Sequence, residues 1–396
     1  MRVSQALSKM MGIVIALIIV VAVVAGVTSY YMVSSQQRVA IATPSPTPSP
    51  RIAPSPSPII TPQTPVATPT KTPEVKVTAI RIGTTEAGSV GYVLGSILAN
   101  ELKKIFPDIS ISTYPVGGYP INVNQFAQGN IELAYVGTIA LGPAWKREPP
   151  FDTLPQGAKL PAFTSALYDV VFCLATTPEL KGKLGINSWR DLDGKKVSIF
   201  TSGWMSHRIL MQALQLLGIK VSHIELGVYS SQQGDAIKRG EVVTIGIHGT
   251  AGLASPGTLE FLSKMDLVII NPSPEDAEKV MKAGLGFTWL PVSAVNWTKP
   301  MGVDRMFCLV EYTGWHTTPD ILPEDFVYKM LKHLIENKDK LAEQHAYLKL
   351  FAKDPVNVLV RAISLLPPEV PIHPGTAKLL KEYNAWKPEW DKRIAK

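Results

Sequence analysis

The chain has 396 residues, with 39 Lys and Arg against 32 Asp and Glu. Six of the basic residues and one of the acidic residues lie in residues 1–76, so the remainder carries 33 against 31 and is close to neutral. The basic charge therefore belongs to the N-terminal region, and it does not predict nucleic-acid binding by the folded part. Roughly 320 residues remain for folding, enough for about two domains.

Residues 1–34 are predicted to be a signal or membrane anchor. An apolar run extends from Met10 to about Val33, which is long enough to cross a bilayer as a helix of ~20 residues. Arg2 and Lys9 precede it, and basic flanks stay on the cytoplasmic side. The sequence thus favours an uncleaved single-pass helix with the rest of the chain extracytoplasmic, and a cleaved secretory signal is the alternative.

Residues 35–76 are predicted to be a disordered linker. Pro alternates with Ser and Thr through much of this stretch, and such a composition supports neither helix nor core. We expect an extended stalk between the membrane and the folded body.

The folded part opens on a strand, a loop of small residues and a helix. The β-branched run around Ile82 leads into Gly83–Tyr92, and apolar residues then recur at three- and four-residue spacing from Leu94 to Ile105. The first turn of a helix has unpaired N–H groups and the positive end of the helix dipole. A loop of small residues at this point is suited to a carboxylate or a phosphate.

The same order of elements occurs twice. In the first copy, strands are expected at 109–114 and 132–137, with a helix near 122–128. In the second, a strand at 196–200 leads into Ser202–Ser206 and an amphipathic helix, and a further strand, a helix near 232–238 and a strand at 242–247 follow. Two such βαβαβ units predict two similar lobes with loops at the carboxyl ends of parallel strands.

The fold class expected is therefore α/β, with a ligand cleft between two similar lobes. We place lobe I at 77–172, lobe II at 173–265, and a return to lobe I with C-terminal helices at 266–396. The strand-like Tyr168–Thr176 is a candidate segment crossing between the lobes.

Neither the cysteines nor any enzyme motif in the sequence indicates catalysis. Cys173 and Cys308 lie in apolar runs and are interpreted as buried free thiols, with one disulfide as the alternative if their strands pair. No GxSxG, HExxH or CxxC motif is present, so we predict no enzyme, no cofactor and no metal.

Several segments together resemble the TAXI-type solute receptors of TRAP transporters. They are Gly83–Tyr92, Gly118–Asn122, Gly129–Gly137, Asp191–Val197 and Ile372–Ala377. The similarity covers residues 79–386. It implies a type II periplasmic-binding-protein fold, and a receptor that delivers a small organic anion, an amino acid or a dicarboxylate, to a membrane permease driven by an ion gradient.

The loop positions and the resemblance assign sixteen candidate ligand-binding residues. His207 and Arg208, just inside a helix, are further candidates for neutralising a carboxylate. The sixteen are Thr84, Thr85, Gly88, Ser89, Tyr92, Gly118, Asn122, Gly137, Thr138, Ser202, Gly203, Trp204, Met205, Ser206, His248 and Thr250.

Two functions remain open at this point. The first is a membrane-tethered receptor whose partners are a small organic anion and TRAP-type permease subunits. The second is a tethered sensor that signals to a membrane partner. The nine residues before the apolar run leave no room for a signalling domain, which favours transport.

Overall fold

The computed structural model describes residues 77–226 and 231–396. The predicted anchor at 1–34 and the linker at 35–76 lie outside the described residues. Within the described part, no helix combines the length and the apolar composition needed to span a membrane.

The first set of elements follows the predicted order. Parallel strands β1 (Ala79–Thr84) and β2 (Ser110–Pro115) flank α2 (Val90–Ile105), and α3 (Tyr119–Ala127) leads to β3 (Ala134–Gly137). A bridge between Ile82 and Leu133 places β3 beside β1, so the strand order is β2-β1-β3. The apolar face of α2 packs against these strands because Leu94, Leu98 and Leu102 are buried.

The second set repeats this arrangement. Here β5 (Lys196–Ser198) pairs in parallel with β6 (Ser222–His223) and with β7 (Thr244–Thr250), which gives the order β6-β5-β7. Helices α6 (Met205–Leu216) and α7 (Ser231–Lys238) connect these strands. The predicted duplication of one βαβαβ plan is therefore confirmed.

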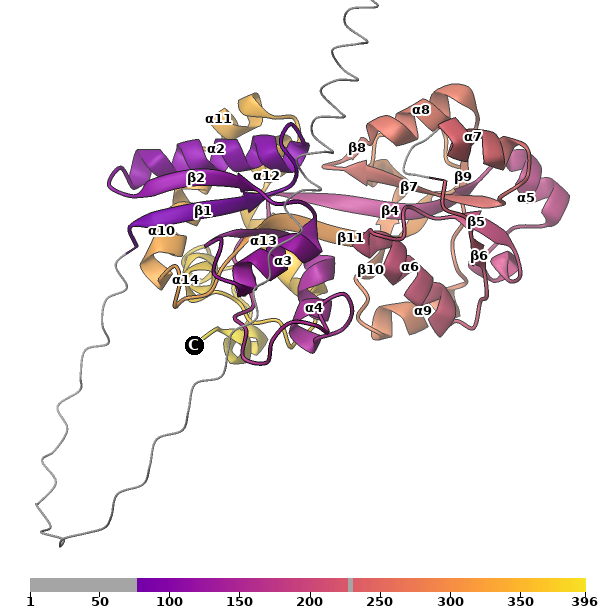
Figure 1. Cartoon of the computed structure of the whole chain (residues 1–396). Helices are drawn as coiled ribbons and strands as arrows, with labels where there is room; N and C mark the ends of the chain where they lie inside the picture. Colours follow the sequence, from indigo (N-terminus) through magenta and orange to yellow (C-terminus); the bar gives the residue numbers. More distant parts are fainter. Residues whose placement is uncertain (1–76, 227–230) are drawn as a thin grey trace, which may run out of the picture. The chain divides into compact units, whose positions relative to one another are not determined.

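Two long strands join the two sets. β4 (Tyr168–Thr176) pairs antiparallel with β7 and with β11 (Arg305–His316), and β11 also pairs antiparallel with β3. Figure 1 shows β4 extending past β11 to β7. The sequence indicated the first crossing strand but not the second, because β11 is buried along nearly its whole length and lacks alternation.

The remaining elements surround this sheet. They are α4 (Thr138–Lys146), α5 (Pro178–Leu184), η1 (Trp189–Leu192), β8 (Leu253–Ala254), α8 (Pro256–Lys264), β9 (Val268–Ile269), α9 (Pro274–Lys282), β10 (Phe287–Pro291), η2 (Val292–Ala294), α10 (Glu324–Glu336), α11 (Lys338–Gln344), α12 (Leu348–Lys353), α13 (Pro355–Leu365), α14 (Pro374–Glu382) and η3 (Pro388–Arg393). Helix α10 packs against α2 and α14, and α13 packs against β11. The described residues form one compact unit, so the lobe boundaries after 172 and 265 stay predictions.

A disulfide joins the two crossing strands. The interpretation of Cys173 and Cys308 as free thiols is wrong, because their sulfur atoms are bonded and their Cα atoms lie 5.0 Å apart. The register explains the pairing, since Leu309 lies opposite Phe172 and the next pair along the antiparallel strands is Cys308 and Cys173. The register was not available from the sequence, which left both readings of the thiols open.

Candidate functional site

A cavity of about 390 Å³ is lined by elements of both sets. The first set contributes the loop after β1 and the starts of α2 and α3, and the second contributes the start of α6 and the end of β7. The crossing strands β4 and β11 supply further lining residues. The cavity is therefore placed where a doubly lobed α/β fold binds its ligand, at the carboxyl ends of parallel strands.

Half of the candidate residues line this cavity. Among them, Ser206 is buried and its hydroxyl oxygen has no hydrogen-bond partner among the described residues. A ligand atom can supply that partner. The eight lining candidates are Thr85, Gly118, Gly203, Trp204, Met205, Ser206, His248 and Thr250.

The other candidates of the first loop shape it and do not line the cavity. The Ser89 hydroxyl caps α2 by accepting from the N–H of Tyr92 at 3.3 Å, and it is hydrogen-bonded to the Thr85 hydroxyl at 2.5 Å. Thr84 is fully buried and donates to the carbonyl of Thr85. Gly88 has a φ of 84°, a left-handed turn conformation. Thr84, Gly88 and Ser89 thus hold the loop in place, and Tyr92 contributes its backbone N–H.

Asn122 ties two loops together from inside the core. Its side-chain amide donates to the carbonyls of Thr84 at 3.2 Å and Gly117 at 2.8 Å, and its carbonyl accepts from the N–H of Tyr135 at 3.1 Å. The side chain is fully buried and does not line the cavity. Its role in the structure is to position the loops of the first set.

Gly137 and Thr138, at the end of β3, also serve neighbouring elements. A Cβ atom at position 137 would overlap the Oε2 atom of Glu311, so the glycine leaves room for that carboxyl group. The Thr138 hydroxyl accepts from the N–H of Tyr312 at 3.0 Å. Thr138 lines a second cavity, described below.

Ser202, His207 and Arg208 lie beside the central cavity. The Ser202 N–H and hydroxyl donate to the carboxylate of Glu225 at 3.0 and 2.9 Å, and these bonds lower the pKa of Glu225. All three residues line an adjoining hollow that shares Trp204 and Met205 with the central cavity. Arg208 is thus not among the residues that line the central cavity.

Sequence reasoning missed the aromatic and acidic lining. Tyr119, Tyr135, Tyr168, Phe172 and Tyr347 line the cavity, as does Glu311 in the middle of β11. The available signal for Glu311 was a lone acid inside the apolar run Met306–Val310 and Tyr312–Trp315. That signal is informative only once the strand is known to cross beneath the ligand site.

The polar groups of the lining are mostly uncharged. Burial raises the pKa of Glu311 to about 8, so its carboxyl group is largely protonated at neutral pH. Burial also lowers the pKa of His248 to about 3, which leaves the imidazole neutral. Tyr119 donates its hydroxyl to Glu311 Oε1 at 3.0 Å. No Lys or Arg is found among the described residues that line the cavity.

Three helices begin at the cavity wall. Helix α3 starts after Gly118 and α6 after Trp204, and neither N-cap residue makes a side-chain cap. Helix α2 starts at Val90, which also lines the cavity. Uncapped N–H groups and the positive ends of helix dipoles can bind a carboxylate without any basic side chain.

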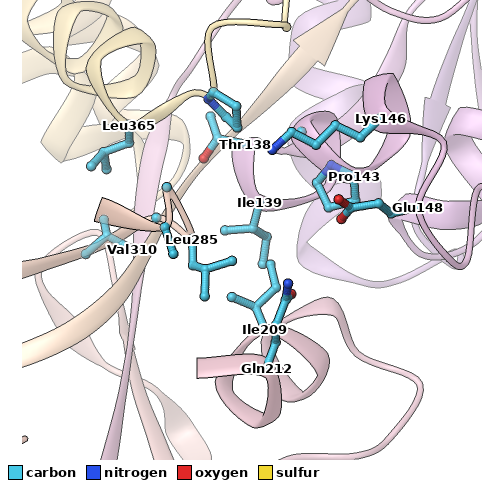
Figure 2. Close-up of a pocket in the computed structure, with 15 residues that line it drawn as sticks. Thr138, Ile139, Pro143, Lys146, Glu148, Ile209, Gln212, Leu285, Val310 and Leu365 are labelled. Atoms are coloured by element: carbon cyan, nitrogen blue, oxygen red, sulfur yellow. The ribbon is translucent and has the colours of Figure 1, made fainter. Parts of the chain in front are cut away.

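A second cavity, of about 230 Å³, lies on the other side of Ile139. Figure 2 shows Ile139 of α4, Ile209 of α6 and Leu285 directing their side chains toward one another. Ile139 lines both cavities, whereas Ile209 and Leu285 line only the second. The contact joins a helix of the first set to a helix of the second beside the crossing strands.

Two repeated α/β sets, joined by two crossing strands and lining one cavity together, define a two-set α/β protein with a candidate ligand site at the carboxyl ends of its parallel strands. The chain belongs to the NMT1-like family, whose model matches residues 82–383.

The solved structures to which the chain is similar are distant in sequence. The periplasmic aliphatic sulphonate binding protein SsuA from Escherichia coli is 17% identical, with a TM-score of 0.41, 81% of this chain covered and 98% of that one. For MatC from Rhodopseudomonas palustris with bound malate, the identity is 12%, the TM-score 0.39 and the coverage 74% and 99%. No curated protein matches the sequence.

Proposed function

We propose that this protein is a membrane-tethered extracytoplasmic receptor that captures a small organic solute between its two lobes and delivers it to a TRAP-type secondary transporter. The observation that carries the proposal is the cavity that helix starts and strand ends of both repeated units line together. The sequence resemblance to TAXI-type receptors supports the choice of transporter. The disulfide between the crossing strands is consistent with a body outside the cytoplasm.

The predicted ligand class is a small organic anion, an amino acid or a dicarboxylate. Its carboxylate would be bound by the N–H groups at the starts of α3 and α6. The eight candidate residues that line the cavity, with Ser206 as an unpaired donor, are proposed as ligand contacts. Closure of the lobes about β4 and β11 would then enclose the ligand.

A thermal-shift screen of the full-length protein tests receptor function. The panel contains the proteinogenic amino acids, 2-oxo acids, succinate and L-malate. A ligand that binds only the folded state raises the melting temperature. Absence of stabilisation by every compound would contradict the receptor function.

A matched pair of variants tests the location of the site. Trp204 and Tyr383 are both 39% exposed, but only Trp204 lines the cavity. Trp204→Ala should weaken binding of the stabilising compound by about 10-fold or more, the usual effect of removing a contacting aromatic ring. Tyr383→Ala should leave the affinity unchanged. Equal affinities of the two variants would exclude this cavity as the ligand site.

The genomic neighbourhood tests the delivery step. A neighbouring gene for a protein with many membrane spans is expected for a TRAP-type system. A neighbouring gene for an ATPase would instead indicate a different uptake machinery, and a neighbouring kinase or cyclase gene would favour the tethered sensor.

A further inference from the structure

The central cavity has the composition of a cation-binding site. Six of its lining residues are Phe, Tyr or Trp, and its two carboxyl groups are those of Glu86 and Glu311. Among the described residues that line it, none is a Lys or an Arg. Aromatic faces attract a desolvated ammonium group, and a carboxyl group in the same wall adds to that attraction. A dicarboxylate would place a second negative charge against this wall.

Glu311 is the buried member of the two acids. It is 3% exposed, its Oε1 atom accepts from Tyr119, and its Oε2 atom has no hydrogen-bond partner in the described part of the chain. Gly137 leaves the space that the carboxyl group occupies. A buried carboxyl group without a cationic partner is costly unless it stays protonated or a bound group supplies the missing charge.

We propose that the ligand carries a protonated amine, which binds against the Glu311 carboxyl group and the surrounding aromatic rings while the ligand carboxylate binds at the helix starts. This inference rests on the proposed receptor function and selects, within the predicted ligand classes, an amino acid over a dicarboxylate. Glu311 is then the residue that determines specificity for the amine.

Ligand binding is coupled to a proton at Glu311. Since burial raises its pKa to about 8, the free protein holds this proton at neutral pH, and an ammonium group arriving beside the carboxyl group releases it. The affinity for an amine should therefore rise with pH until about 8. A ligand with only negative charge shows the opposite trend. The other titratable groups that line the cavity are Tyr119, Tyr135, Tyr168 and Tyr347, all with raised pKa values, together with His248, with a lowered pKa, and Glu86.

Pairs of ligands that differ only in the amine test the inference. The full-length protein is titrated with L-glutamate and 2-oxoglutarate, L-leucine and 4-methyl-2-oxopentanoate, and L-alanine and pyruvate. We expect the amino acid of at least one pair to bind at least 10-fold more tightly than its 2-oxo partner. Calorimetry in buffers of different ionisation enthalpy should show release of close to one proton at about pH 6.5 and of almost none at about pH 9.

Variants of two acids complete the experiment. Glu311→Gln keeps the size of the side chain and should weaken amino-acid binding by about 10- to 100-fold, the usual loss for a hydrogen bond to a charged group. Glu179→Gln is the control, because Glu179 is an exposed acid of α5 that does not line the central cavity, and it should change the affinity less than 3-fold. Proton release is measured on the unaltered protein, so it does not depend on how the variant folds.

The outcomes separate this inference from the receptor function. Tighter binding of a 2-oxo acid or of succinate, or amino-acid binding without proton release, would overturn the amine assignment and leave a receptor in place. Absence of binding by every compound would refute both proposals.

Discussion

Replacing Asn122 by Ala should destabilise the protein by more than the loss of packing of one small side chain, because buried hydrogen bonds are lost as well. The amide lies fully buried and joins the carbonyls of Thr84 and Gly117 to the N–H of Tyr135. Without it, the Tyr135 N–H is left as a buried donor, at a cost of about 1–3 kcal/mol. The space left by the missing amide adds to this, so we expect a total loss of about 2–4 kcal/mol.

Urea unfolding followed by circular dichroism measures this loss directly. The control is Asn130→Ala, because within residues 77–226 and 231–396 the Asn130 side-chain amide bonds only to the side chains of Gln125 and Gln128. That variant should lose less than about 0.5 kcal/mol. If Asn122→Ala also loses under about 1 kcal/mol with an unchanged m-value, the assignment of Asn122 as the tie between the two loops is wrong.

Three further predictions concern the crossing strands. The folded-state pKa of Glu311 lies above its ordinary 4.5, so its stability contribution is complete below about pH 4.5 and is lost as the pH rises to about 8. In this window the free energy of unfolding of the unaltered protein should fall, relative to that of Glu311→Gln, by at most about 1.4 kcal/mol per pH unit. Urea unfolding of both proteins at several pH values measures this. A difference in stability that does not change with pH would contradict the buried protonated acid. The Cys173–Cys308 disulfide links residues that are 135 positions apart, and its reduction should lower the free energy of unfolding by about 2–5 kcal/mol. The same urea midpoint with and without reductant would contradict this. Gly137→Ala should lower the free energy of unfolding by about 1–3 kcal/mol, because the added Cβ overlaps Glu311. Gly182→Ala is the control and should not destabilise the protein, since there is open space around Gly182. Equal stabilities of the two variants would refute the overlap.

The structure places the candidate residues of the two equivalent loops differently. Those at the start of α6, from Gly203 to Ser206, line the cavity. Ser89 follows an equivalent loop, but its hydroxyl caps its own helix. A side chain that lines the cavity and a side chain that caps its own helix are both compatible with a strand–loop–helix sequence pattern. The sequence pattern does not specify whether a loop side chain turns toward a neighbouring lobe or back to its own backbone.

The prediction of an anionic ligand also rests partly on features visible in the sequence and partly on features that depend on tertiary contacts. Helix starts with small residues were recognisable in the sequence, and they do lie at the cavity. The Glu311 carboxyl group in the same cavity was not recognisable, because Glu311 is 192 residues from its hydrogen-bond partner Tyr119. Its burial, and the raised pKa that follows, depend on contacts between these distant segments.

The amino-acid sequence by itself determined the order of strands and helices, the duplication of one plan and the position of the crossing strand β4. These properties follow from local hydrophobic periodicity and from turn residues, which act within a few residues of the chain. Only the tertiary structure decided that β11 is a second crossing strand, that Cys173 meets Cys308 and that Glu311 enters the cavity. Each of these depends on the register between strands far apart in the chain, which is set by packing of the whole core.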